Sequence, residues 1–297
     1  MEKNRGVIGI ITPASSLDEA QKIREGLSYL TGLGYDVRMG DFVFGSRNHF
    51  SGTPQERARD IMNFFSDSEV KAIVCSCGGS GSAMVLPYLD YEIIRSHPKP
   101  VIGFSDITAL QNAIYARANV SSLAGIMLKF DFYDTRIDSK TKTSFEELLK
   151  GKLSPCRSGD ILNFGKASGV MLGGNLCTFM SLAGTPYFPS LKNTVLVLED
   201  VDEKSYSIER MLTHLEQLPD FNEVSGIIFG QFTNCGLNHP EDRDIEGVID
   251  EFAARHRKIT MIKHFPHGHI KSRICLPIGK KVLLNATENL PILEMTD

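Results

Sequence analysis

Short apolar runs alternate with segments of helical pattern through the N-terminal half of this 297-residue chain, and this alternation constrains the fold most. The runs at 6–11, 72–77 and 101–104 are largely apolar, which is typical of strands that are buried on both faces. A strong helix start lies between them at Thr53-Pro54-Gln55-Glu56, where a capping threonine precedes a proline and a glutamate. The alternation predicts an α/β fold with an N-terminal parallel sheet flanked by helices.

The alternation weakens between residues 129 and 166, where polar residues prevail. Beyond this segment, further apolar runs of β character alternate with amphipathic helical patterns, and these runs lie at 194–198, 226–230 and 278–284. The sequence therefore predicts an N-terminal α/β domain at 1–140, a connecting segment at 141–166 and a smaller β-rich α+β C-terminal domain at 167–297.

Composition excludes several classes of partner. The net charge is −4 and no block of Lys or Arg occurs, so nucleic acid is not an expected partner. No apolar run is long enough to span a bilayer, and the run at 7–11 is too short for a signal peptide. The six cysteines are scattered, which does not predict a disulfide framework in a chain of this length. We therefore expect a cytoplasmic globular protein with no membrane partner.

The stretch 101–110 carries one serine between a strand and a helix. The apolar run breaks at Gly103, Ser105 follows, and a helical pattern begins at Asp106. A hydroxyl at such a turn lies beside the amides of a helix N-terminus, which can stabilise the oxyanion formed when the hydroxyl attacks a carbonyl. The pattern alone also fits an ordinary N-cap serine, which is the commoner reason for a serine at this position.

A nucleophilic Ser105 needs a base and an orienting acid, and the second half of the chain contains candidates for both. Glu199 follows the apolar run at 194–198, and histidines gather near the C-terminus, so the chain order serine, acid, histidine matches some serine hydrolases. The nucleophile motif G-x-S-x-G is incomplete, because Ile107 occupies the position of its second glycine. Glu199 also fits a plain solvated carboxylate at a strand end.

Two other patterns suggest a ligand. His264, His267 and His269 lie close enough in sequence for a metal site, although the sequence lacks a clear zinc motif and Cys75-x-Cys77 has no second cysteine pair. The loop Gly78-Gly79-Ser80-Gly81-Ser82 follows a predicted strand, and its glycines allow backbone amides to approach a phosphate or an oxyanion. A purely structural turn explains the loop equally well, since the lysine of a P-loop is absent.

Together, six ordered segments make the chain resemble the LD-carboxypeptidase family of serine peptidases, family S66. Each segment is weakly specific, and their order over nearly the whole chain carries the resemblance. They are residues 9–16; 78–79 with 86–90; 103–110; 173–176; 198–200; and 268–269 before 276–279.

The resemblance implies a triad in which Ser105 is the nucleophile, His269 the general base and then acid, and Glu199 the carboxylate that orients the histidine. It implies an oxyanion hole made of the backbone N–H groups of Gly79 and Asp106, so that Asp106 would act through its amide and not its carboxylate. It further implies a site between the two domains, no metal or other cofactor, and a homodimer.

The family resemblance implies two substrate classes. One is murein tetrapeptide, whose terminal D-alanine is released during cell-wall recycling, and this is our main expectation. The other is an aminoacyl- or peptidyl-nucleotide conjugate, as for a protein similar to the microcin C immunity protein. Cys77, Ser80 and Met84 differ from the residues common in the murein branch, whereas the total length of the chain is closer to that branch.

A non-catalytic ligand-binding protein is the alternative from another functional class. By position, 42–50 and 129–136 are candidates to line the site.

Overall fold

The computed structural model describes residues 5–17, 20–131 and 137–296. Within these residues, the N-terminal half forms a sheet of six strands in the order β12-β5-β4-β3-β1-β2. Five of the strands are parallel to one another, and the sixth, β12, pairs antiparallel with β5. They are β1 (Val7–Ile11), β2 (Asp36–Met39), β3 (Val70–Cys75), β4 (Val101–Gly103), β5 (Ser122–Ala124) and β12 (Leu276–Ile278).

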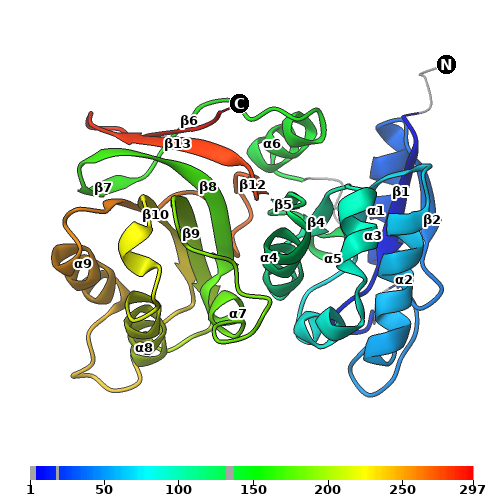
Figure 1. The fold of residues 1–297 in the computed structure, drawn as a ribbon, viewed down its shortest axis with the longest axis horizontal. Helices are drawn as coiled ribbons and strands as arrows, with labels where there is room; N and C mark the ends of the chain where they lie inside the picture. Colours follow the sequence, from blue (N-terminus) through cyan, green and yellow to red (C-terminus); the bar gives the residue numbers. More distant parts are fainter. Residues whose placement is uncertain (1–4, 18–19, 132–136, 297) are drawn as a thin grey trace.

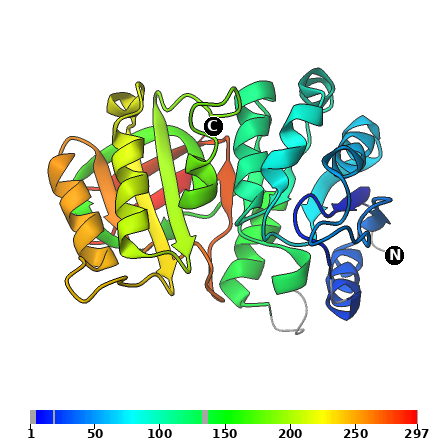
Figure 2. The same ribbon diagram turned by 90° about the horizontal axis from the view of Figure 1, so that it is seen from below.

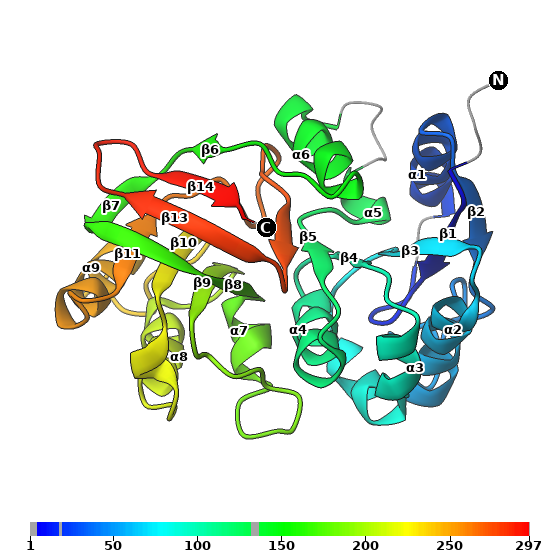
Figure 3. The same ribbon diagram turned by 45° about the horizontal axis from the view of Figure 1, so that its top comes forward.

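Helices cover both faces of this sheet, as Figure 3 shows. One face carries α1 (Ala20–Gly32), α5 (Leu128–Asp131) and α6 (Ser139–Leu149), and the other carries α2 (Pro54–Ser66), α3 (Tyr91–Ser96), α4 (Ile107–Ala118) and the 3-10 helix η1 (Ser82–Tyr88). Strand β1 is buried throughout because its side chains alternate between two apolar clusters. Ile8 and Ile10 pack in the cluster that includes Phe145 of α6, whereas Ile11 packs in the cluster of Ile61 in α2. The predicted parallel sheet with helical flanks is confirmed.

The start of α2 matches its sequence signature. The Oγ1 atom of Thr53 accepts a hydrogen bond from the backbone N–H of Glu56 at 3.2 Å, and the Glu56 carboxylate accepts the N–H of Thr53 at 2.8 Å. Pro54 occupies the first helical turn. This reciprocal capping satisfies amides that the helix itself leaves unpaired.

The described C-terminal residues form a sheet of eight strands in the order β6-β14-β13-β8-β9-β10-β11-β7. Four adjacent strands of this sheet, β8 to β11, are parallel, and α7 (Leu176–Met180), α8 (Ser205–Glu216) and α9 (Ile245–Arg255) pack against it (Figure 2). The fold is therefore α/β with a second, strand-rich unit, as expected. The strands are β6 (Cys156–Arg157), β7 (Asp160–Asn163), β8 (Gly165–Asn175), β9 (Thr194–Val201), β10 (Gly226–Thr233), β11 (Thr260–Lys263), β13 (Lys281–Ala286) and β14 (Ile292–Met295).

The predicted strand at 278–284 is two strands that belong to different sheets. Strand β12 joins the N-terminal sheet, the chain turns at Gly279 with a φ of 85°, and β13 joins the C-terminal sheet.

The segment 141–166 contains most of α6 together with β6 and β7, and both of these strands belong to the eight-stranded sheet. The boundaries at 140 and 167 remain predictions.

Helix α4 lies where the two sheets meet (Figure 1). It is buried nearly all round, and its buried residues include the polar side chains of Thr108, Gln111 and Asn112. A helix this enclosed can position a group at its N-terminus against both halves of the molecule. Among the described helices, none has the length and apolar character needed to cross a membrane.

Candidate active site

Ser105 lies on a tight turn between β4 and α4. Its φ of 62° is unusual for a residue with a side chain, and such conformations cost about 1–3 kcal/mol and gather at functional sites. Gly103 makes the turn possible, because a Cβ atom there would lie 2.8 Å from Cγ2 of Ile107. The strand–turn–helix predicted around this serine is therefore present, with the hydroxyl at the carboxyl end of a parallel strand.

His269 and Glu199 form a hydrogen-bonded pair. Nδ1 of His269 lies 2.7 Å from Oε2 of Glu199, whose side chain is 1% exposed, whereas that of His269 is 19% exposed. A carboxylate can only accept, so Nδ1 carries a proton, and in the neutral imidazole Nε2 is the nitrogen with the lone pair. Gly268 allows this contact, because a Cβ atom there would lie 2.9 Å from the Glu199 carboxylate. Glu199 lies within β9 and is not a solvated strand end.

Ser105 and His269 line the same cavity, which has a volume of about 420 Å³. The serine comes from the turn after β4, and the histidine comes from the loop that follows β11. Both are described residues, and no hydrogen bond joins the two side chains in this structure. The ring of Phe104 lies 5.1 Å from that of His269 and contributes to the same wall.

The glycine loop 78–82 borders Ser105. Gly79 lines the cavity with a φ of 98°, and a Cβ atom there would lie 2.2 Å from Oγ of Ser15. A Cβ atom on Gly78 would lie 3.3 Å from Cβ of Ser105, so the backbone passes close to the serine. Among the described residues, no acceptor is hydrogen-bonded to the N–H of Gly79 or of Asp106. Gly79 lines the cavity, whereas Asp106 is not among the lining residues.

The carboxylate of Asp106 has a role that sequence reasoning missed. Its Oδ2 accepts the backbone N–H of Ser82 at 2.8 Å, and its backbone oxygen accepts the Ser82 hydroxyl at 2.5 Å. Burial raises the pKa of the Asp106 carboxyl, while the hydrogen bond from the Ser82 N–H opposes that change. The side chain thus ties the glycine loop to the start of α4. The sequence contains no local signal for this contact, since the two segments are far apart in the chain.

The three C-terminal histidines have separate partners. His264 lies between the carboxylates of Asp160 and Glu246, at 2.6 and 2.9 Å. His267 is fully buried and donates from Nδ1 to the carbonyl oxygen of Ile274 at 2.9 Å, and burial lowers its pKa. Within the described residues, no group of three or more potential ligands is placed to hold a metal ion. The three histidines, which were considered above as a possible metal site, therefore do not converge.

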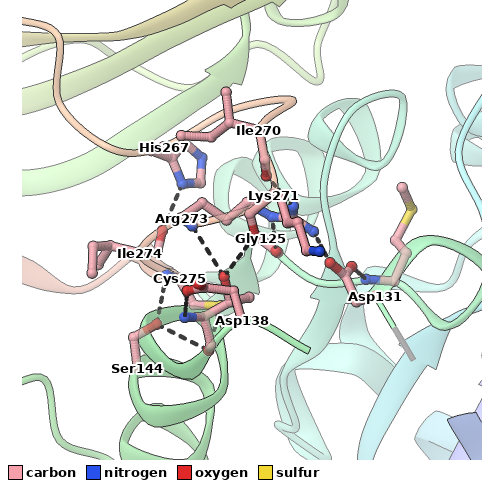
Figure 4. Close-up of polar contacts among 12 residues, drawn as sticks. Gly125, Asp131, Asp138, Ser144, His267, Ile270, Lys271, Arg273, Ile274 and Cys275 are labelled. Carbon is pink, nitrogen blue, oxygen red and sulfur yellow. Dashed lines mark hydrogen bonds and ion pairs between the residues drawn. The ribbon is translucent and has the colours of Figure 1, made fainter. Parts of the chain in front are cut away.

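A buried ion pair forms part of the cavity wall, and sequence reasoning did not identify it (Figure 4). Arg273 lines the cavity and pairs with Asp131 of α5, and the side chain of each is 5% exposed. Phe130 and Asp131 confirm that the segment 129–136 reaches the site, whereas residues 132–136 lie outside the described chain. None of the residues described as lining the cavity comes from the loop 42–50.

Helix α4 is hydrogen-bonded directly to the end of β8. The amide of Asn112 donates to the carbonyl oxygen of Gly173 at 2.8 Å and accepts the N–H of the same residue at 3.0 Å. One turn earlier, Oγ1 of Thr108 accepts the N–H of Asn175 at 3.1 Å. Asn175 is opposite Glu199 in the β8–β9 register, so these bonds connect the serine's helix to the strand of the acid.

Asp200 stabilises the same contact between α4 and β8 from the C-terminal side. Its Oδ1 accepts the side-chain amide of Asn175 at 2.7 Å, and its Oδ2 accepts the N–H of Cys177 at 2.9 Å. Burial raises the pKa of Asp200 to about 6. The motif Gly173-Gly174-Asn175 is thus a contact between the two halves of the protein. Close approach also explains Gly174, where a Cβ atom would lie 2.5 Å from Oγ1 of Thr108.

Comparisons with known proteins agree with this architecture. The family model for the LD-carboxypeptidase N-terminal domain matches residues 8–125, and the model for the LD-carboxypeptidase C-terminal domain matches residues 168–284. A Bacillus subtilis protein described as a probable murein peptide carboxypeptidase is 32% identical, over 98% of this chain and 92% of that protein.

Two solved structures are also similar. An MccF-like protein from Bacillus anthracis matches with a TM-score of 0.86 and 26% identity, covering 99% of this chain and 98% of that one. A muramoyltetrapeptide carboxypeptidase from Oxalobacter formigenes matches with a TM-score of 0.88 and 24% identity, covering 97% of this chain and 99% of that one. The likeness to the second structure concerns the fold alone.

Proposed function

Because this chain belongs to the LD-carboxypeptidase family and is a serine hydrolase, we propose that it hydrolyses an L,D-peptide bond with Ser105, His269 and Glu199 as its catalytic triad. The observation that carries the proposal is the placement of Ser105 and His269 on one cavity, with His269 bonded to the buried Glu199. A serine hydroxyl on the cavity wall and an imidazole that can accept its proton are the groups that acyl transfer requires.

In the proposed reaction, Oγ of Ser105 attacks the carbonyl carbon of the scissile bond while Nε2 of His269 removes the hydroxyl proton. Glu199 stabilises the imidazolium that forms. The oxyanion accepts hydrogen bonds from the N–H groups of Gly79 and Asp106. His269 then protonates the leaving amine, and water, activated by the same imidazole, hydrolyses the acyl-enzyme and regenerates Ser105. The serine and histidine must come within hydrogen-bonding distance during this cycle.

Murein tetrapeptide is the substrate class that we favour, with release of the terminal D-alanine. The similarity to the Bacillus subtilis murein peptide carboxypeptidase over nearly the whole chain supports it. An aminoacyl- or peptidyl-nucleotide conjugate is the second candidate, because the fold is equally close to an MccF-like protein and the glycine loop departs from the murein branch. The resemblance to the family also leads us to propose that the protein is cytoplasmic and forms a homodimer. Light scattering on the purified protein would test the dimer.

The proposal is tested by substitution of the nucleophile. Ser105→Ala is expected to abolish turnover of murein tetrapeptide while the circular dichroism spectrum stays unchanged. Activity retained in this variant, or activity lost when a chelator is added to the wild type, would exclude the serine mechanism. Side-by-side assays of a murein tetrapeptide and an aminoacyl sulfamoyl nucleotide would decide between the two substrate classes.

A further inference from the structure

The loop that carries His269 is held by a buried guanidinium. We propose that Arg273, oriented by Asp131, is a positioning residue that sets the His269 imidazole against Ser105. This inference rests on the proposed catalytic roles of His269 and Ser105. It assigns no contact with the reacting atoms to Arg273 itself.

The first support is the contact that Arg273 makes beside the histidine. Nη1 of Arg273 donates to the carbonyl oxygen of Ile270 at 2.5 Å, and Ile270 donates its own N–H to the carbonyl oxygen of Gly268 at 2.9 Å. His269 is therefore the central residue of a tight turn, and the guanidinium holds the carbonyl oxygen of the last residue of that turn, Ile270. Without this bond, the peptide between Ile270 and Lys271 could rotate and loosen the turn that carries the imidazole.

The second support is that the other guanidinium contacts come from the N-terminal half. Nε of Arg273 donates to the carbonyl oxygen of Gly125, which directly follows β5, and Nη2 is paired with Oδ1 of Asp131. Asp131 is itself held, because its Oδ2 accepts the backbone N–H of Met127 at 2.7 Å. The planar fork of an arginine suits three acceptors in fixed directions, which a lysine cannot match.

The third support links the same group to the serine. The guanidinium carbon lies 4.5 Å from the centre of the Phe104 ring, and Phe104 immediately precedes Ser105. The Phe104 ring also lies 5.1 Å from the His269 ring. Arg273 thus contacts the residue before the proposed nucleophile and the residue after the proposed base, across the boundary between the two halves.

Energetics favour a positioning role over a stabilising one. The Arg273 and Asp131 side chains are each 5% exposed, so both charges lose nearly all of their hydration. The desolvation of such a pair offsets much of its Coulomb attraction, and apolar residues of similar volume often give equal stability. The Arg273–Asp131 pair makes three further hydrogen bonds, and together these contacts hold the two side chains in one conformation. The geometry that the pair defines is that of the cavity wall next to His269.

The test uses two variants. Arg273→Lys keeps the positive charge but loses the planar guanidinium, and Asp131→Asn keeps the side-chain shape but loses the negative charge. Arg243→Lys is the matched control, since Arg243 forms an exposed pair with Glu209 at 2.6 Å. Each full-length protein is assayed for kcat and KM on murein tetrapeptide. The rate at which a small fluorophosphonate modifies Ser105 is measured as well, because this reaction depends on the serine and the histidine but not on peptide-binding contacts.

We expect kcat and the modification rate to fall together, by about 10-fold to 100-fold, in both variants, because displacement of a catalytic group by about 1 Å has effects of this size. KM should stay within about twofold of the wild type, and the control should be unaffected. An increased KM with an unchanged modification rate would show that Arg273 binds substrate, and unchanged rates would show that it only packs; either result overturns the inference. Failure of the proposed function is distinct, since the wild type would then show no modification that depends on Ser105.

Discussion

Nδ1 of His269 lies 2.7 Å from Oε2 of Glu199, and the two residues are 70 positions apart in the chain. Glu199 projects from β9, one of the central strands of the C-terminal sheet, whereas His269 comes from the loop after β11. The carboxylate is buried and the imidazole reaches the cavity. This arrangement places a proton on Nδ1, and the proposed mechanism uses the other ring nitrogen, Nε2, to accept the serine proton.

Glu199→Gln tests the orienting role of the acid. The amide can donate to Nδ1 and thereby favours the wrong tautomer, so we expect kcat to fall by about 10³–10⁴ with the fold retained. Glu209→Gln, on the exposed face of α8, is the control and should leave kcat unchanged. A Glu199→Gln enzyme within about tenfold of the wild type would show that the carboxylate does not orient the base.

Asp106→Ala tests the carboxylate contact that holds the glycine loop. The substitution keeps the N–H of residue 106 but leaves the N–H of Ser82 without its acceptor, so Gly79 should lose its fixed position. We expect kcat to fall by about 10-fold to 100-fold. This is a smaller loss than the factor of about 10²–10³ that follows when an oxyanion donor is removed outright. Asp106→Asn, which keeps a side-chain acceptor, should be milder. Equal kinetics for the alanine variant and the wild type would contradict this view.

The hydrogen bonds between α4 and β8 lead to a prediction about stability. Asn112→Ala leaves the N–H and the carbonyl oxygen of Gly173 buried and unpaired, and we expect the free energy of unfolding to fall by about 2–4 kcal/mol. Thr108→Val should also destabilise the protein, because it removes the acceptor of the Asn175 N–H, whereas Thr108→Ser should not. Urea unfolding measures all three variants. A valine variant as stable as the serine variant would argue against the bond.

The buried His267 predicts a pH dependence of stability. Burial lowers its pKa in the folded protein below the ordinary value of 6.5, so the unfolded chain binds a proton that the folded chain resists. The free energy of unfolding should therefore fall as the pH decreases below about 6.5, by up to about 1.4 kcal/mol per pH unit from this residue. Asp200, with its pKa raised to about 6, acts in the opposite direction.

His267→Gln isolates the histidine, because Asp200 is present in both proteins and its effect cancels in the difference. The wild type should lose more stability than the variant between pH 7 and pH 5 in urea unfolding experiments. Parallel curves for the two proteins would show that His267 does not titrate on unfolding.

Local patterns predicted those parts of the structure that depend on neighbouring residues. The capping box at Thr53 and Glu56 confirms the start of α2, and the turn at Gly103 with the helix after Ser105 is present. The split between β12 and β13 was not predicted, because an apolar run does not reveal which sheet each part of it will join. Asp131, Arg273 and the Asp106 carboxylate were missed for a similar reason, since their partners are distant in sequence.

The sequence by itself determined which segments become strands and helices, because backbone sterics, capping and the spacing of apolar side chains act over a few residues. It also determined the family, through six short segments in a fixed order. The family resemblance pointed to His269, but only the tertiary structure shows that His269, and not His264 or His267, is hydrogen-bonded to Glu199 and lines a cavity with Ser105. That choice depends on the packing of two sheets around α4, and such packing is set by contacts between residues that are far apart in the chain.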